Sequence, residues 1–199
     1  MPDTYLTLAR TATGEYTEKR SKFLAFAIPV KTVDEAMGHV AGYQKEYYDA
    51  RHVCYAYMLG AERDIFRAND NGEPSGTAGK PILGQINSRN LTDLVIIVVR
   101  YFGGVKLGTG GLIVAYRLAT QAALDNAEVI ERTVDDQITV TFEYTLMNSV
   151  MRVVKEEAPQ ILAQQFDNDC RLLLSLRRSS MPRLRDRLSK LDGVRIEDS

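Results

Sequence analysis

Hydrophobic residues form two kinds of pattern in the first part of this 199-residue chain. Runs of apolar and β-forming residues at Phe23–Val30, His52–Leu59 and Leu94–Val99 have almost no polar face, which is typical of strands covered on both sides. Apolar residues spaced by three and four follow at residues 32–48 and again at 109–126, which predicts two amphipathic helices. The first part therefore predicts a sheet with helices packed on it.

Shorter patterns complete this part of the chain. Ile65–Ala68 is rich in β-forming residues and is predicted to pair with the preceding strand across a turn. Pro81 can open a short helix through Ile86, because the missing N–H group of proline costs nothing in a first helical turn. Residues 3–20 have little periodicity, so they form either an edge strand or a loosely ordered segment.

The second part of the chain has a regular order of elements. Its predicted strands and helices alternate as βαββαβ, with residues in the order 138–144, 146–157, 161–166, 170–176, 182–191 and 194–196. This order is ferredoxin-like. The weakly periodic segment 127–136 lies between the two patterns, and it places a domain boundary so that the predicted domains are residues 1–131 and 132–199. The predicted fold class is α+β.

Composition narrows the classes of function. The chain is 45% hydrophobic and 26% charged, which is ordinary for a soluble globular protein. The net charge of −1 gives no global excess of cations, so any site for a polyanion has to be local. Cys54 and Cys170 lie far apart in apolar contexts, which favours buried reduced thiols. No apolar window is long enough to span a membrane, so a cytoplasmic protein without a membrane partner is expected.

Two glycine-rich loops flank the Leu94–Val99 strand. Asp70–Lys80 contains three glycines and one proline, which predicts a long surface loop. Gly103–Gly111 contains five glycines and leads into a helix for which Thr109 is the predicted N-cap. A strand, a glycine-rich loop and a helix in this order often present backbone N–H groups to an anion.

Three known motifs fail on these loops. A phosphate-binding Walker loop would need a glycine at Pro74 and a hydroxyl residue at Pro81. The dinucleotide fingerprint would need a glycine at Ile113, and a nucleophile elbow around Ser75 would need one at Glu73. A less specific anion site remains at the start of the helix, near Arg100 and Lys106. The alternative is that the glycines only allow positive φ angles and tight packing.

Single residues allow several interpretations. His52 and Cys54 point to one face of a strand, but no third ligand completes a metal site, so core packing is the favoured interpretation and no metal or cofactor is expected. A hydrolase arrangement of Ser75, His52 and Asp70 has no support in the sequence. Glu73 is either a base or ligand carboxylate or, as we favour, a solvated turn residue.

The end of the Leu94–Val99 strand carries a notable cation. Arg100 follows the apolar run directly and either reaches solvent or serves a site, and the site is favoured. Tyr101 and Phe102 can be core residues on opposite faces of the sheet. In the last helix a basic face can meet RNA phosphates or simply be solvated, and it contains Arg183, Arg185, Arg187 and Lys190.

Longer motifs resemble a known family. Ser21–Lys22–Phe23, Ala50–Arg51–His52, the loop DNGEPSGTAGKPIL and the segment VVRYFGGVKLGTGGL together resemble the IMPACT family, including its bacterial YigZ-type members. The resemblance covers residues 20–125 and implies an N-terminal domain like domain 2 of ribosomal protein S5. It also implies a C-terminal domain like the last domain of related elongation factors.

The resemblance connects the chain with translation. Eukaryotic relatives bind the activator of a general amino-acid-control kinase and restrain the kinase. Those relatives carry an additional RWD-type domain for which this chain is expected to have no room, so that partner does not transfer. The family brings no established catalytic residue.

We therefore expect a non-enzymatic cytosolic protein that binds RNA or a ribosome-associated partner through the Asp70–Lys80 and Arg100–Gly111 loops. The alternative is a binder of, or enzyme for, a phosphorylated small molecule, with Thr109–Gly111 holding the phosphate. The oligomeric state is not predicted. The candidate binding residues are Lys22, His52, Asp70, Asn71, Glu73, Ser75, Thr77, Lys80, Arg100, Gly103, Gly104, Lys106, Thr109, Gly110 and Gly111.

Overall fold

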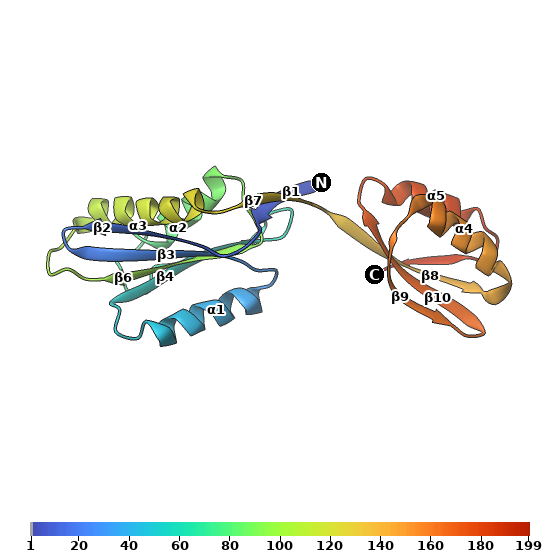
Figure 1. The fold of residues 1–199 in the computed structure, drawn as a ribbon, viewed down its shortest axis with the longest axis horizontal. Helices are drawn as coiled ribbons and strands as arrows, with labels where there is room; N and C mark the ends of the chain where they lie inside the picture. Colours follow the sequence, from blue (N-terminus) through green and yellow to red (C-terminus); the bar gives the residue numbers. More distant parts are fainter. Residues whose placement is uncertain (1) are drawn as a thin grey trace. The chain divides into compact units, whose positions relative to one another are not determined.

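The computed structural model describes residues 2–199, so Met1, with which the predicted first domain begins, lies outside the described residues. The chain divides into two compact units (Figure 1). One unit is Thr4–Arg132, and the other is Thr133–Ser199 together with Pro2 and Asp3. Both units combine helices with sheets, so the predicted α+β class is confirmed.

The larger unit is built on a five-stranded sheet in which all neighbouring strands are antiparallel. The predicted buried strand is its central one. In spatial order the strands are β2 (Ala12–Glu18), β3 (Ser21–Pro29), β6 (Leu94–Tyr101), β4 (His52–Leu59) and β5 (Ile65–Asn69).

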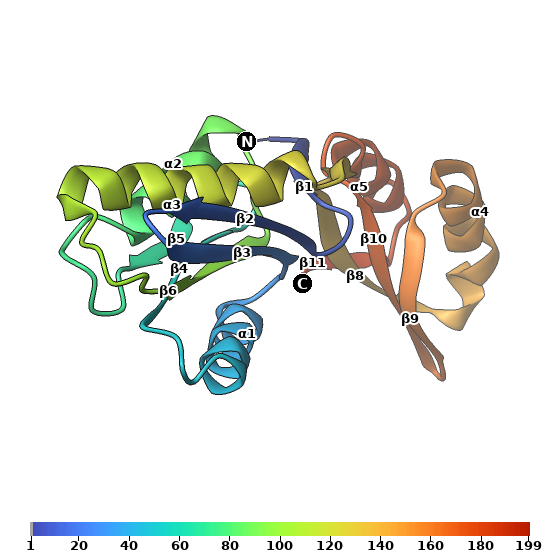
Figure 2. The same cartoon turned by 60° about the vertical axis from the view of Figure 1, so that its left-hand side comes forward.

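Helices cover both faces of this sheet (Figures 1 and 2). Helix α1 (Val33–Glu46) lies on one face, and α2 (Gly79–Ser88) and α3 (Gly108–Asp125) lie on the other. The even-numbered aliphatic residues of β6 pack with α2 and α3, whereas the odd-numbered ones pack with α1. This alternation explains the unbroken apolar run, because each face of β6 borders a separate hydrophobic core.

The predicted capping box begins α1. The Thr32 side chain accepts a hydrogen bond from Glu35 N at 3.1 Å. The Glu35 carboxylate reaches back one residue further than expected and accepts a hydrogen bond from Lys31 N at 2.7 Å. The first interaction satisfies a backbone N–H group that the first helical turn leaves without a partner, and the second holds the residue just before the N-cap.

The first twenty residues contain two strands. β2 lies at the edge of the five-stranded sheet. An edge strand was one of the two alternatives predicted for residues 3–20. The other strand, β1 (Thr4–Leu8), pairs with β7 (Val129–Thr133) in a separate two-stranded sheet. The sequence pattern missed both β1 and β7. Neither strand has a fully buried side, so neither shows strong period-two patterning.

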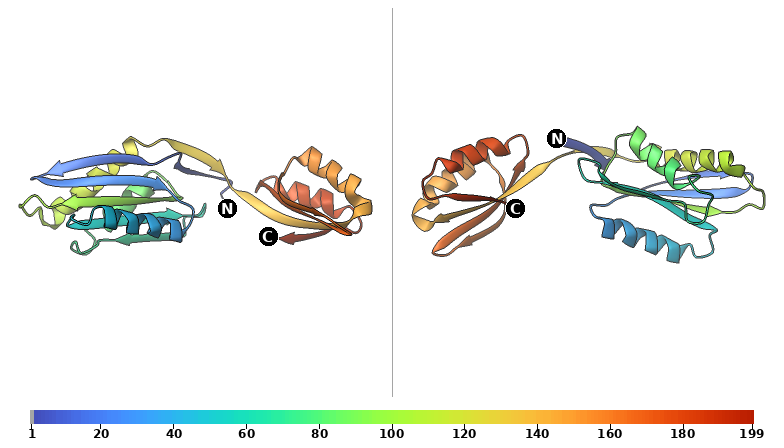
Figure 3. Two further views of the ribbon diagram at one scale, coloured as in Figure 1. Left: turned by 60° about the horizontal axis from the view of Figure 1, so that its bottom comes forward. Right: turned by 180° about the vertical axis from the view of Figure 1, so that it is seen from behind.

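The smaller unit is a four-stranded antiparallel sheet with two helices on one face (Figure 3). Numbered within the unit, its strands lie in the order 4-1-3-2, which is the ferredoxin-like order predicted from the sequence. The elements are β8 (Asp135–Glu143), a 3₁₀ turn (Tyr144–Leu146), α4 (Met147–Glu157), β9 (Gln160–Phe166), β10 (Asp169–Arg177), α5 (Met181–Ser189) and β11 (Arg195–Asp198).

The basic face of α5 is not a free cationic surface. Each of its four cations forms an ion pair with a carboxylate, and these pairs are Arg183–Glu157, Arg185–Asp198, Arg187–Glu156, Arg187–Glu157 and Lys190–Asp186. The carboxylates lower the positive potential that RNA phosphates would meet here. None of the helices within residues 2–199 is long and apolar enough to cross a membrane.

Close packing of α3 on the sheet depends on Gly14 of β2. A Cβ atom at Gly14 would lie 2.2 Å from Ala123 N and 2.4 Å from Ala122 C, both in the backbone of α3. The alanine-rich face of α3 allows this approach, because alanine has the smallest side chain with a Cβ atom.

We expect Gly14→Ala to lower the free energy of unfolding by about 1–3 kcal/mol, because α3 has to move away from β2. Gly42→Ala is the matched control, since Gly42 lies in α1 and a Cβ atom there would meet nothing within 4 Å. The free energy of unfolding of the Gly42→Ala control should rise by about 0.5–1 kcal/mol, because alanine is favoured over glycine inside a helix. Urea unfolding of both variants measures the difference, and equal effects would contradict this account of the packing.

Candidate functional site

Arg100 lies at the end of β6 on the face covered by α3. It shares this face with the even-numbered aliphatic residues of the strand, and its register partners are Phe23 on β3 and His52 on β4. Directly opposite residues of antiparallel strands point to the same side, so the three side chains converge. Arg100 is only 5% exposed. The interpretation in which its side chain reaches solvent is therefore wrong.

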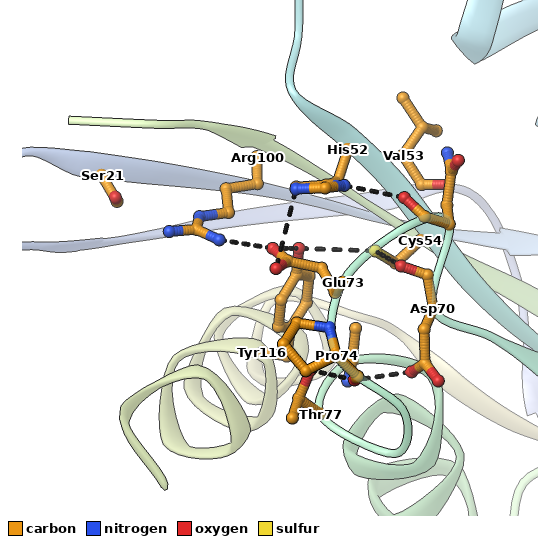
Figure 4. Close-up of polar contacts among 12 residues, drawn as sticks. Ser21, His52, Val53, Cys54, Asp70, Glu73, Pro74, Thr77, Arg100 and Tyr116 are labelled. Atoms are coloured by element: carbon orange, nitrogen blue, oxygen red, sulfur yellow. Dashed lines mark hydrogen bonds and ion pairs between the residues drawn. The ribbon is translucent and has the colours of Figure 1, made fainter. Parts of the chain in front are cut away.

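Glu73 neutralises this buried guanidinium (Figure 4). Arg100 Nη1 donates a hydrogen bond to Glu73 Oε1 at 2.6 Å, and the Tyr116 hydroxyl donates to the same oxygen at 2.8 Å. The Glu73 side chain is 3% exposed, so the favoured interpretation of Glu73 as a solvated turn residue is wrong. Its loop folds inward because a buried cation needs a nearby anion.

His52 completes the polar cluster from β4. Its Nδ1 lies 2.7 Å from Asn71 O, and since a carbonyl oxygen only accepts, Nδ1 carries a proton and donates it. The other ring nitrogen, Nε2, lies 3.6 Å from Glu73 Oε2. His52 therefore faces the carboxylate and not Asp70 or Ser75, so the hydrolase arrangement is absent.

Cys54 and Tyr116 close the inner side of the cluster. The Cys54 thiol can donate its single hydrogen to Asp70 O at 3.0 Å or to the Tyr116 hydroxyl at 3.4 Å. Burial raises the pKa of the Cys54 thiol to about 12, and burial followed by the neighbouring Cys54 and Glu73 raises the pKa of Tyr116. Both groups stay protonated at neutral pH, so neither adds a negative charge to the cluster.

Asp70 holds the first glycine-rich loop in place. Its Oδ1 accepts hydrogen bonds from Ala78 N at 3.1 Å and Gly79 N at 2.8 Å, and its Oδ2 accepts one from Gly76 N at 2.8 Å. Asp70 thereby caps α2, whose own N-cap residue supplies no side-chain hydrogen bond. The expected surface loop is pinned at its base, and this fixes the position of Glu73.

Backbone requirements explain part of the second glycine-rich loop. A Cβ atom at Gly103 would lie 2.1 Å from the carbonyl carbon of Arg20, and Gly108 has a φ angle of +72°. Packing and positive φ, the alternative kept open by the sequence, therefore account for these two positions. They do not account for Gly110, where a Cβ atom would meet nothing within 4 Å.

The N-terminus of α3 has no side-chain cap. The N-cap residue is Leu107 and not Thr109, which lies exposed in the first turn. No acidic residue lies in that turn. The first backbone N–H groups of α3 therefore have no side-chain acceptor among residues 2–199, and the helix dipole adds partial positive charge at the same place.

A pocket of about 410 Å³ joins this helix end to the buried cluster. Both glycine-rich loops contribute to the pocket, and so does Arg51, which directly precedes β4. The lining residues are Arg51, His52, Glu73, Pro74, Arg100, Phe102, Lys106, Leu107, Gly108, Thr109 and Leu112.

Cationic groups dominate the charge of the pocket. Arg51 and Lys106 are exposed and form no ion pair within the part of the chain that the structure describes. The guanidinium of Arg100 lies 5.5 Å from the ring centroid of Phe23 and 5.6 Å from that of Phe102. Phe102 is 46% exposed, so its expected place in the core is wrong, whereas Tyr101 does pack with the core on the α1 side.

The pocket contains five of the candidate binding residues, namely His52, Glu73, Arg100, Lys106 and Thr109. Others support it: Asp70 and Asn71 anchor the loop, and Thr77 donates a hydrogen bond to Pro74 O at 2.6 Å. The remaining candidates do not line the pocket, and these are Lys22, Ser75, Lys80, Gly103, Gly104, Gly110 and Gly111.

Sequence reasoning missed two polar or aromatic contributors. Arg51 stands out in the sequence only as part of a motif, although it directly precedes a strand whose first residue, His52, is a candidate. Phe102 was interpreted as a residue that can be core, on the opposite sheet face from Tyr101. The regular strand ends at Tyr101, which leaves Phe102 on the loop beside the pocket.

Asp70 gives a test of the loop anchor. Burial opposes ionisation of its carboxylate, but the hydrogen bonds from Gly76, Gly79 and Ala78 outweigh burial and lower its pKa below 3.8. We expect Asp70→Asn to lower the free energy of unfolding at pH 7 by about 1–3 kcal/mol, because an amide N–H₂ group replaces one acceptor.

The effect should depend on pH. The pKa of Asp70 is lower in the folded state than in the unfolded state. The contribution of its carboxylate to the free energy of unfolding is therefore complete above the unfolded-state pKa, and it is lost as the pH falls through the folded-state pKa. The difference between the wild type and Asp70→Asn should therefore shrink below about pH 3.8. Urea unfolding across acidic pH measures it, with Asp64→Asn in an exposed turn as the control. A constant difference at all pH values would count against the charged anchor.

Cys54 gives a second test. We expect the native protein to react negligibly with a thiol reagent at pH 8, because a buried thiol with a pKa of about 12 supplies almost no thiolate. Both Cys54 and Cys170 are buried, so two thiols should react only after denaturation. Rapid labelling of the native protein that disappears in Cys54→Ala would contradict this burial.

Comparisons with known proteins agree with the sequence motifs. The Impact N-terminal domain profile matches residues 19–124. The IMPACT family member YvyE of Bacillus subtilis is 36% identical over 156 residues, covering 78% of this chain and 72% of YvyE. An IMPACT family member of Haemophilus influenzae is 31% identical over 183 residues, covering 89% of this chain and 87% of the relative.

A solved structure is similar over the whole length. The crystal structure of a hypothetical protein covers 100% of this chain and 98% of its own, with a TM-score of 0.79 and 27% sequence identity. The profile match includes both glycine-rich loops, the strand end at Arg51 and the N-terminus of α3, so the pocket lies within the matched region. The chain belongs to the IMPACT family.

Proposed function

We propose that this chain is a non-enzymatic cytosolic binding protein that acts in translation or its regulation and binds RNA through the pocket at the N-terminus of α3. The observation that carries the proposal is the combination of unpaired cations and an uncapped helix N-terminus in one pocket. Phosphate groups bind to cationic side chains and to backbone N–H groups of this kind.

Local charge supports RNA as the ligand. The whole chain has a net charge of −1, so non-specific attraction of a polyanion is weak. Arg51 and Lys106 nevertheless place two exposed cations on the rim of one pocket. By contrast, the cations of α5 are paired with carboxylates. The pocket is therefore the better place for phosphate contacts.

An aromatic surface supports a nucleotide more than a bare anion. Phe102 lines the pocket with 46% of its surface exposed. Bases of single-stranded RNA stack on exposed aromatic rings, whereas a ligand without a ring would gain less from Phe102. Pro74, Leu107 and Leu112 add further apolar surface near the same opening.

Family membership supports the connection with translation. The motifs that resemble the family occupy the same loops that form the pocket. The resemblance connects its members with translation, and RNA is the common component of that machinery. A ribosome-associated protein as the partner would give a different outcome in the experiment below, since binding would then need the protein and not free RNA.

One specific observation favours the second candidate, a phosphorylated small molecule. The pocket volume of about 410 Å³ lies within the range of ≈ 300–1,000 Å³ that small-molecule sites occupy. Thermal-shift measurements with nucleotides and sugar phosphates distinguish the two candidates. Stabilisation by a small phosphate compound without any RNA binding would support the second.

We expect single-stranded RNA to bind in a salt-dependent way and the Arg51→Ala/Lys106→Ala double variant to bind at least about tenfold more weakly. The slope of log affinity against log salt should fall by about 0.7 for each phosphate that the variant no longer neutralises. Fluorescence anisotropy at several salt concentrations measures both quantities.

The matched control is Lys22→Ala/Lys80→Ala, which removes two exposed cations that do not line the pocket. It should retain the wild-type affinity and most of the salt dependence. Equal affinity of the wild type and the Arg51→Ala/Lys106→Ala variant, or a flat salt dependence of the wild type, would overturn the proposal.

A further inference from the structure

We infer that the pocket binds the phosphorylated end of an RNA strand, that is, a phosphomonoester, in preference to a phosphodiester within the strand. The inference rests on the proposed function and identifies which part of the RNA enters the pocket. Three features carry it: the unused Nη2 donor of Arg100, the charge balance of the lining, and the closed base of the pocket.

Arg100 has one accessible donor that no described residue uses. Only its Nη1 forms a hydrogen bond with a described residue, and that bond holds Glu73. Nε is buried without any partner, and Nη2 forms no hydrogen bond within residues 2–199. Figure 4 shows the outer guanidinium nitrogen turned away from Glu73. Nε is shielded from solvent, so Nη2 is the nitrogen of Arg100 that remains to donate a hydrogen bond to a phosphate oxygen in the pocket.

The amides of α3 and the Arg100 side chain line the same pocket. Gly108 and Thr109 belong to the uncapped first turn, and Arg100, whose side chain is 6% exposed, lines the same pocket. A helix N-terminus binds an anion more strongly when a side chain donates to the same group. One phosphate group that reaches both would supply acceptors for two sets of otherwise unpartnered donors.

The charge balance favours a dianion. Three cations line the pocket, Arg51, Arg100 and Lys106, against the single carboxylate of Glu73. The formal excess is therefore two positive charges before His52 is considered. A phosphomonoester carries about −1.5 to −2 at neutral pH, because its second pKa is about 6. A phosphodiester carries only one negative charge, so it would leave part of the excess uncompensated.

The base of the pocket is closed by buried side chains. Glu73, Arg100 and Leu112 line it, and each is less than a tenth exposed. Tyr116, fully buried, lies behind Glu73 and donates a hydrogen bond to it. A strand that placed an internal phosphate here would have to enter and leave through the same opening, whereas a strand end needs only to enter.

The experiment compares one short single-stranded RNA in three forms with an internal fluorescent label. The forms have hydroxyl groups at both ends, a 5′-phosphate, or a 3′-phosphate. We expect the full-length protein to bind one phosphorylated form at least about tenfold more tightly than the hydroxyl form, and the form that gains identifies the end. Equal affinities for all three forms would overturn this inference and leave the proposed RNA function intact.

Two further outcomes are decisive. Absence of binding to any RNA form would overturn the proposed function and this inference together. A nucleoside monophosphate that competes as well as the phosphorylated RNA at equal concentration would show that the strand contributes nothing, which also overturns the inference and supports the small-molecule candidate.

Arg100→Lys tests the role of the Nη2 donor. Lysine keeps the positive charge beside Glu73 but lacks a second guanidinium nitrogen that can donate to a phosphate at the same time. We expect the preference for the phosphorylated end to fall from tenfold to nearly none, while binding of the hydroxyl form changes little. Arg89→Lys is the matched control, because Arg89 pairs with Asp125 away from the pocket. An unchanged preference in a folded Arg100→Lys protein would contradict the assignment of Nη2 as the phosphate donor.

Discussion

The buried ion pair between Arg100 and Glu73 is the interaction on which the site depends. It connects the end of β6 with the first glycine-rich loop, and Tyr116 adds α3 through a hydrogen bond to the same carboxylate oxygen. Removing one partner of a buried pair leaves an uncompensated charge, which typically costs about 3–5 kcal/mol. Three elements distant in sequence are thereby held in one arrangement, and the pocket lies where they meet.

Most of the fold could be predicted because its patterns are local. The apolar run of β6, the helical spacing of α1 and α3, and the ferredoxin-like order of the last elements all appear in the structure as expected. β1 and β7 could not be predicted, because each is short and their pairing joins opposite ends of a unit. Periodicity reports burial, and these strands are only partly buried.

The candidate site was predicted less completely, for a physical reason. The residues around Glu73 in the sequence are typical of a solvated turn. Its burial is explained only by its partner Arg100, which lies 27 residues further along the chain. Local rules cannot anticipate a charge pair between segments that far apart. Glycine enrichment was ambiguous in the same way, since Gly103 serves close packing whereas Gly110 has open space around it. The structure distinguishes a glycine needed for close packing from a glycine with open space around it, whereas the amino-acid composition of the loop does not.

The two-sided burial of β6 gives Arg100 a role in folding specificity. A strand that is apolar on both faces has little to define its register, because a shift by one residue exchanges one set of aliphatic side chains for another. Arg100 removes that ambiguity. The same shift would turn the guanidinium toward α1 and its aromatic neighbours, and so away from Glu73. The charge at the end of the strand thus selects one of two nearly equivalent pairings.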